Sequence, residues 1–188
     1  MNVGLFFGSF NPIHIGHLIV ANVMADHVDR VWFVVSPQNP LKKSNSLLHE
    51  FDRYDMVQKA IQDNHRLQVT DVEFSMPKPS YTIDTLTYLS EKHPQHNFKL
   101  VMGSDNLAQL PKWKNYQLII DNYGLLVYQR PRAKTTELTN HPNVSAVEAP
   151  LLDISASFIR RSVKENRSIR YLVPEVVERY IESQGFYR

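Results

Sequence analysis

An apolar run at residues 3–7 leads straight into the decapeptide Gly-Ser-Phe-Asn-Pro-Ile-His-Ile-Gly-His at residues 8–17. This order predicts a buried strand that ends in a tight turn, with Gly8 allowing the turn and Pro12 stiffening the residues after it. His14 and His17 are three residues apart, so a helical turn would place both imidazoles on one face. The first N–H groups of that helix would point at the same spot. The pattern therefore predicts a site for an anion such as a polyphosphate.

Short apolar runs alternate with amphipathic stretches along the chain. The predicted strands are Val3–Phe7, Val31–Val35, Leu67–Val72, Lys99–Met102, Leu125–Tyr128 and Val144–Val147. The predicted helices are His17–His27, Phe51–Asn64, Thr82–Lys92, Ser157–Glu165 and Glu175–Ser183, with Ser80 or Thr82 capping the third and Gly185 ending the last. The alternation predicts one α/β domain over residues 1–188, with a Rossmann-like, doubly wound, mainly parallel sheet and helices on both faces. Since ligands of such sheets bind at the carboxyl ends of the strands, Gly8 and Gly103 are expected at one pocket.

The composition excludes several other classes of protein. The chain has 21 basic and 19 acidic side chains, a balance that argues against a nucleic-acid-binding protein. It has no cysteine, so disulfides, thiolate catalysis and cysteine-based zinc sites are excluded. The sequence shows no signal peptide and no apolar run long enough to span a membrane, so a cytoplasmic protein without a membrane partner is expected.

A second group of polar residues lies near the C-terminus, in the segment Ile-Ser-Ala-Ser-Phe-Ile-Arg at residues 154–160. Ser155 or Ser157 can cap a helix whose first N–H groups would hold phosphate oxygens. Arg160 follows Ser157 by three residues, on the same helical face, and its guanidinium can bind a phosphate through two hydrogen bonds. The segment predicts a second phosphate-binding element.

The chain resembles a known enzyme family along its whole length. Residues 8–17 resemble the Gly-x-Phe-x-Pro-x-His-x-Gly-His signature of the nucleotidyltransferase superfamily, and residues 154–160 resemble the Ile-Ser-Ser-Thr-x-x-Arg motif of its adenylyltransferases, with Ala156 in place of the usual serine. Ser-Tyr-Thr-Ile-Asp-Thr-Leu at residues 80–86 resembles a segment of bacterial nicotinate mononucleotide adenylyltransferases. So do Gly-Ser-Asp-Asn-Leu at residues 103–107, with Leu110 and Trp113 after it, and the Pro-x-Lys that ends at Lys42.

The resemblance implies an enzyme of NAD biosynthesis that joins nicotinate mononucleotide to ATP by direct in-line attack. It implies His14, His17 and Arg160 as the catalytic residues. The ATP-binding residues that it implies are Gly8, Ser9, Phe10, Gly16, Gly103, Asp105, Arg130, Ser155 and Ser157. The mononucleotide-binding residues that it implies are Asn11, Lys42, Tyr81, Thr82 and Trp113.

The chemistry of these residues agrees with such roles. Trp113 offers a flat face for an electron-poor pyridine ring, and Asp105 can accept hydrogen bonds from ribose hydroxyls or cap a helix. The helix start at Tyr81 and Thr82 can bind the pyridine carboxylate. No carboxylate cage is evident, so Mg²⁺ is expected to arrive with ATP. The resemblance allows a homodimer, and the sequence does not decide the oligomeric state.

Other readings stay open from the sequence alone. The nearest uses nicotinamide mononucleotide, the amide, as the acceptor. Phosphopantetheine adenylyltransferases usually have threonine at the position of His14, cytidylyltransferases are usually shorter, and aminoacyl-tRNA synthetases are longer and have a Lys-Met-Ser-Lys-Ser loop. A non-catalytic nucleotide-binding module on the same fold would bind ATP without releasing pyrophosphate.

Overall fold

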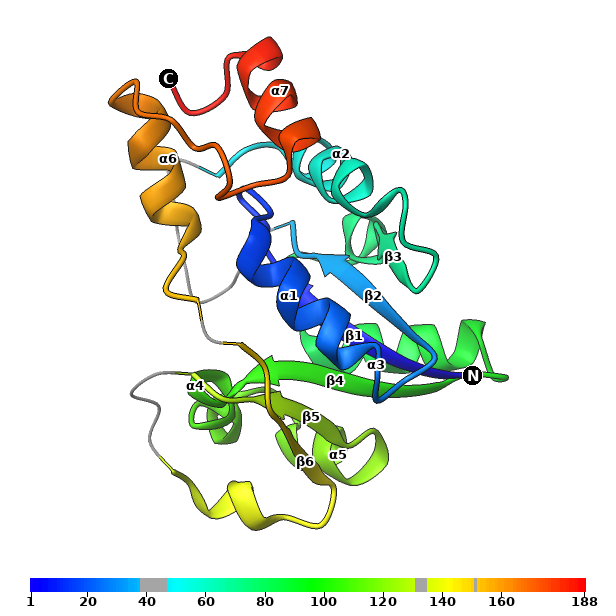
Figure 1. Ribbon diagram of the computed structural model, residues 1–188. Coiled ribbons are helices and arrows are strands. Elements are labelled where there is room, and N and C mark those ends of the chain that lie inside the picture. The colour runs from blue at the N-terminus through cyan, green and yellow to red at the C-terminus, as the bar shows by residue number, and fades with distance from the viewer. Residues whose placement is uncertain (38–46, 131–134, 151) are drawn as a thin grey trace.

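A computed structural model describes residues 1–37, 47–130, 135–150 and 152–188 (Figure 1). Its centre is a six-stranded sheet in the order β3-β2-β1-β4-β5-β6, and every neighbouring pair is parallel. The strands are β1 (Asn2–Gly8), β2 (Arg30–Val35), β3 (Leu67–Thr70), β4 (Asn97–Gly103), β5 (Leu125–Tyr128) and β6 (Val144–Val147). The predicted strands and the parallel sheet are confirmed. The strand order reverses between β1 and β4, which creates a switch point at their carboxyl ends.

The described helices include all five that the sequence predicts. The α-helices are α1 (Ile15–Met24), α2 (Glu50–Ile61), α3 (Thr82–Lys92), α4 (Ser104–Leu107), α5 (Tyr116–Asn122), α6 (Ala156–Lys164) and α7 (Glu175–Gln184). The short 3₁₀ helices are η1 (Val72–Ser75), η2 (Leu110–Lys112) and η3 (Glu137–Asn140). The sequence does not predict α4, α5 or the 3₁₀ helices, because two turns or fewer give no clear periodicity. None of the helices in the described ranges is long and apolar enough to cross a membrane.

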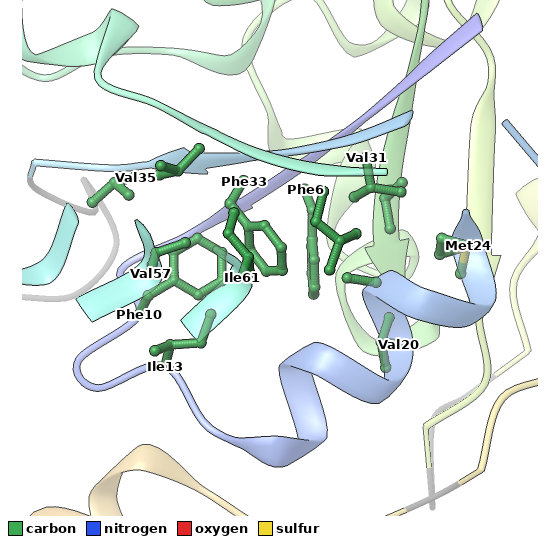
Figure 2. Close-up of a cluster of buried hydrophobic side chains, with 14 of the residues drawn as sticks. Phe6, Phe10, Ile13, Val20, Met24, Val31, Phe33, Val35, Val57 and Ile61 are labelled. Atoms are coloured by element: carbon green, nitrogen blue, oxygen red, sulfur yellow. The ribbon is translucent and has the colours of Figure 1, made fainter. Parts of the chain in front are cut away.

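Helices cover both faces of the sheet, as predicted. Side chains of a strand alternate between the two faces, so an unbroken apolar run supplies two cores at once. Phe6 and Phe33 pack with α1, α2 and α7 on one face, where Figure 2 shows Phe10 and Ile13 in the same cluster. Leu5 packs with α3, α4 and α5 on the other face. The two cores fix the strand ends that carry the predicted site residues.

The start of α3 differs from the prediction. Tyr81 is the residue at the cap position, and its side chain makes no capping hydrogen bond, so the predicted cap by Ser80 or Thr82 is wrong. The Ser80 hydroxyl instead donates to Oε2 of Glu73 over 3.0 Å, and Thr85 donates to Oε1 over 2.7 Å. Glu73 is buried, which raises the pKa of its carboxyl, while these hydrogen bonds act in the opposite direction. The Ser80 hydroxyl therefore bonds to the buried Glu73 carboxyl and does not cap α3.

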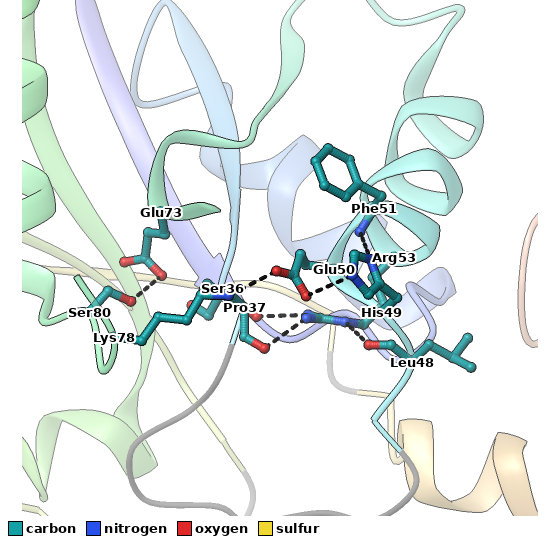
Figure 3. Close-up of polar contacts among 10 residues, drawn as sticks. All are labelled: Ser36, Pro37, Leu48, His49, Glu50, Phe51, Arg53, Glu73, Lys78 and Ser80. Carbon is teal, nitrogen blue, oxygen red and sulfur yellow. Dashed lines mark hydrogen bonds and ion pairs between the residues drawn. The ribbon is translucent and has the colours of Figure 1, made fainter. Parts of the chain in front are cut away.

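A fully buried arginine on α2 ties three segments of the chain together. The Arg53 guanidinium donates to the carbonyl oxygens of Ser9 (2.6 Å), Ser36 (2.8 Å), Pro37 (3.0 Å) and Leu48 (2.9 Å), most of which Figure 3 shows. The Ser9 carbonyl lies after β1, those of Ser36 and Pro37 lie after β2, and that of Leu48 lies before α2. Burial lowers the pKa of Arg53, yet a guanidinium keeps its proton in proteins. Arg53 therefore fixes the spacing of the two chain segments that leave β1 and β2.

We expect Arg53→Met to lower the free energy of unfolding by roughly 3–5 kcal/mol, because four buried or part-buried carbonyls would lose their donor. Urea unfolding followed by circular dichroism measures the change. Arg66→Met is the control, since Arg66 is more exposed and pairs with the exposed Asp26, and it should change stability by about 1 kcal/mol or less. Equal losses in the two variants would contradict the role given to Arg53.

Candidate active site

The turn after β1 gets its shape from Phe10 rather than from Gly8. Phe10 has a φ of 44°, in the left-handed region, whereas Gly8 does not lie in that region. The Phe10 ring is buried against Phe6, Phe33 and His17. A Cβ on Gly8 would lie 2.7 Å from that ring, so glycine is needed there for space. The predicted role of Gly8 as the turning residue is wrong, and Phe10, predicted to bind ATP, is buried in the core.

The two histidines of the motif lie together at the start of α1, as predicted. His14 is the N-cap residue and is buried, and His17 is in the first turn. Their imidazole rings stack with centroids 3.6 Å apart. The backbone N–H of His14 donates to Nδ1 of His17 over 3.3 Å. In a neutral ring this arrangement leaves the proton on Nε2 of His17, which can then donate to a ligand.

Both imidazoles are neutral at pH 7 in the free protein. Burial, with the nearby charge of Arg130, lowers the pKa of His14 to about 4. Burial holds the pKa of His17 well below its ordinary value, and the nearby charges of His14 and Arg130 act in the same direction to a smaller extent. The pair therefore offers hydrogen bonds rather than positive charge.

Arg130 forms the facing wall, at the end of β5. Its guanidinium donates to the Tyr128 hydroxyl over 3.0 Å and lies 4.0 Å from Oδ1 of Asp105. Its backbone N–H donates to the Ser104 hydroxyl over 2.8 Å. A Cβ on Gly103 would lie 2.4 Å from Oδ1 of Asp105, so this glycine leaves room for the carboxylate. The predicted ATP-binding residues at the ends of β4 and β5 therefore form one cluster.

Gly16 makes space for the histidines. A Cβ there would lie 3.1 Å from Nδ1 of His14. The His14 ring therefore occupies the space beside Gly16, one of the residues predicted to bind ATP.

The C-terminal motif meets the first motif, although the two are distant in sequence. Ser155 caps α6 by accepting from the Phe158 backbone N–H over 3.2 Å, which confirms one of the two predicted caps. The Arg160 guanidinium donates to the Asn11 carbonyl over 2.8 Å and to the Ser157 hydroxyl over 3.3 Å. Arg160 therefore joins the start of α6 to the turn that precedes His14.

A pocket lies between these elements. Its lining combines predicted residues with a segment that the motifs do not identify: His14, Gly16, His17, Val20, Tyr128, Arg130, Pro150, Leu152 and Ile154. The apolar side chains of Pro150, Leu152 and Ile154 come from the connection between β6 and α6. Ile154 opens the C-terminal motif, whereas the sequence gives no signal for Pro150 and Leu152. The pocket joins a polar wall to an apolar one, which suits a nucleotide.

Three of the predicted mononucleotide-binding residues lie at the start of α3 and just after η2: Tyr81, Thr82 and Trp113. Lys114, which the sequence did not single out, pairs with Asp84 over 2.9 Å and lies over the Tyr81 ring at 4.8 Å. It follows Trp113 directly, so it holds the Trp113 segment against the start of α3, where Thr82 lies. Lys114 thus links the segment after η2 to Tyr81 and Asp84 at the start of α3.

Three further predicted residues have different outcomes. The Asn11 side-chain oxygen accepts from the Tyr187 hydroxyl over 2.8 Å, so it serves a contact inside the protein. The Ser9 carbonyl accepts from Arg53. Lys42 lies outside the described residues. Within the described ranges, no group of three or more histidine, aspartate or glutamate side chains is placed to hold a metal ion.

Residues 5–162 match the model of the family described as cytidylyltransferase-like. The chain belongs to this family, whose members are nucleotidyltransferases.

Curated relatives narrow the assignment. A protein of Cytophaga hutchinsonii named "Probable nicotinate-nucleotide adenylyltransferase" is 58% identical over 100% of this chain and 98% of its own length. One of the same name from Flavobacterium johnsoniae is 46% identical, with 100% of both chains covered. Within its family, the chain groups with the nicotinate-nucleotide adenylyltransferases.

Solved structures share the fold. A Plasmodium falciparum nicotinic acid mononucleotide adenylyltransferase complexed with APC is 22% identical, with a TM-score of 0.83 over 99% of this chain and 96% of its own. The structure of the Plasmodium falciparum enzyme complexed with NaAD gives a TM-score of 0.82 at 21% identity, over 99% and 97%.

The low pKa of His14 predicts a pH-dependent stability. Its pKa is about 4 when folded and about 6.5 when unfolded, so the unfolded chain binds the proton more readily. The free energy of unfolding should fall as the pH drops from 6.5 to 4. The fall in the wild type should exceed that in His14→Asn by up to roughly 3 kcal/mol. Urea unfolding of both proteins between pH 7.5 and 4 measures this difference. Parallel pH profiles for the two would contradict a neutral, buried His14.

Proposed function

We propose that this protein is a nicotinate-nucleotide adenylyltransferase, which transfers AMP from ATP to nicotinate mononucleotide and releases pyrophosphate. The observation that carries the proposal is the neutral His14–His17 pair at the N-terminus of α1, facing Arg130 across a pocket at the switch point of the sheet. Full-length identity to curated relatives of that name supports the same reaction. Fold, site and family thus agree on adenylyl transfer.

The reaction needs no protein nucleophile. A 5′-phosphate oxygen of the mononucleotide attacks the α-phosphorus of ATP, and the bond from that phosphorus to the bridging oxygen breaks as pyrophosphate leaves. Catalysis then consists of alignment and of stabilising the negative charge on the transferring group. The Nε2–H of His17 can donate to an α-phosphate oxygen. Arg160 and the start of α6 can hold the departing pyrophosphate.

A buried nitrogen atom of Arg130 supports a bound polyphosphate. Arg130 Nε is buried and makes no hydrogen bond within the described part of the chain. Buried polar atoms normally have partners, and phosphate oxygens would supply them. We expect MgATP, rather than ATP alone, to be the substrate, with the ion held mainly by the phosphates.

The proposed site for the second substrate is the start of α3 with Trp113. The N–H groups at the start of α3, with the Thr82 hydroxyl, can bind the carboxylate of the pyridine ring. Trp113 can stack on that ring. The amide analogue lacks the charge that a helix N-terminus favours, so the acid should be the preferred acceptor.

We expect pyrophosphate release from ATP and Mg²⁺ with nicotinate mononucleotide, much slower release with its amide, and none with phosphopantetheine. A coupled pyrophosphate assay with the three acceptors in parallel measures this directly. Preference for the amide would keep the chemistry and contradict the role of the α3 N-terminus. ATP binding without turnover would indicate a non-catalytic module.

His17→Ala should lower turnover about a hundredfold or more, because it removes one preorganised donor to the transferring group. Steady-state rates at saturating substrate, with circular dichroism to confirm the fold, test this. His27→Ala is the control, since His27 is exposed and follows α1 away from the pocket. Near-normal turnover of folded His17→Ala would remove His17 from the mechanism.

A further inference from the structure

The last turn of the chain reaches back to the first motif. The hydroxyl of Tyr187 donates to the side-chain oxygen of Asn11 over 2.8 Å, across 176 positions of sequence. Asn11 is 3% exposed and immediately precedes Pro12 and the segment that leads into His14. The same Asn11 oxygen lies 3.4 Å from the Leu48 backbone N–H. This contact therefore acts on the backbone turn that carries both histidines.

The surroundings of Tyr187 keep its hydroxyl a donor. Burial raises the pKa of Tyr187 above its ordinary value, while the charges of Arg160 and Arg53 act in the opposite direction. Both arginines themselves donate to carbonyls of this turn, Arg160 to that of Asn11 and Arg53 to that of Ser9. Three donors from three different helices or loops thus converge on residues 9–11.

Tyr187 and Phe10, the residue before Asn11, both have an unfavourable backbone conformation. Tyr187 has a φ of 65° and Phe10 a φ of 44°, both in the left-handed region that non-glycine residues avoid. After α7, whose C-cap is Gly185, the Tyr187 ring packs beside Phe186 against the core that contains Phe6 and Phe33. Residues held in such conformations are kept there by their surroundings and often lie at functional sites.

We propose that Tyr187 is a positioning residue for adenylyl transfer, acting through its hydrogen bond to Asn11 on the turn that presents His14 and His17. Tyr187 does not touch the substrates. It fixes the turn, and the turn fixes the donors that stabilise the transferring phosphoryl group. This inference rests on the proposed function.

Tyr187→Phe removes only the hydroxyl and keeps the packing of the ring. We expect kcat to fall about tenfold, the effect of one lost hydrogen bond on alignment, while the KM values for ATP and nicotinate mononucleotide change less than about threefold. We also expect faster amide hydrogen exchange at residues 9–17, measured by mass spectrometry without substrate.

Tyr180→Phe is the matched control. It also removes one hydroxyl from the C-terminal part of the chain. That hydroxyl donates to Asp55 over 3.3 Å, and neither residue lines the pocket. It should leave kcat and the exchange at residues 9–17 within about twofold of the wild type. Unchanged exchange in Tyr187→Phe, equal losses in both variants, or a change confined to KM would each overturn the positioning role. Absence of turnover in the wild type would instead contradict the proposed function, and the exchange measurement would still decide whether Tyr187 fixes the turn.

Discussion

The hydrogen bonds from Arg53 to four backbone carbonyls are the constraint on which the site depends. Parallel strands end in loops, and nothing in a sheet itself sets how those loops are spaced. Arg53 bridges the segments that follow β1 and β2, and Glu73 extends the connection to Ser80 and Thr85 near the start of α3. Ser36 contacts both, since its carbonyl accepts from Arg53 and its side chain hydrogen-bonds to Glu73. Two buried ionisable side chains, each satisfied by hydrogen bonds, thus link the segments after β1 and β2 to the start of α3.

Neutral and charged groups have separate tasks in the pocket. His14 and His17 lose their charge through burial, so in the free protein they offer directed hydrogen bonds to a phosphate. The positive charge comes from Arg130 and Arg160, which stand on other elements. A bound polyphosphate would raise the pKa of both imidazoles, so substrate binding would itself increase their affinity for a proton. The hydrogen bonds from His14 and His17 to the phosphate would therefore become stronger as negative charge builds up between the two rings.

Sequence patterns predicted the features that depend on local spacing. The apolar runs at residues 3–7 and 31–35 predicted buried parallel strands, and the spacing of His14 and His17 predicted one helical face. The fit of Phe10 over Gly8 could not be predicted, because it depends on packing between segments. Arg53 could not be found either, since an arginine on an amphipathic helix resembles an ordinary surface residue. Lys114 gave no signal because its partner, Asp84, lies thirty positions away.

The contacts of Asn11 with Arg160 and Tyr187 span 149 and 176 positions, and they have a consequence for the order of events during synthesis. A ribosome delivers the histidine turn early and the residues that complete it late. Contacts of such long range form late because closing long loops costs entropy. A nascent or shortened chain can therefore build β1, β2 and α1 while the pocket is still incomplete. The pocket is thus complete only after the segments that carry Arg160 and Tyr187 have been made and have folded back onto Asn11.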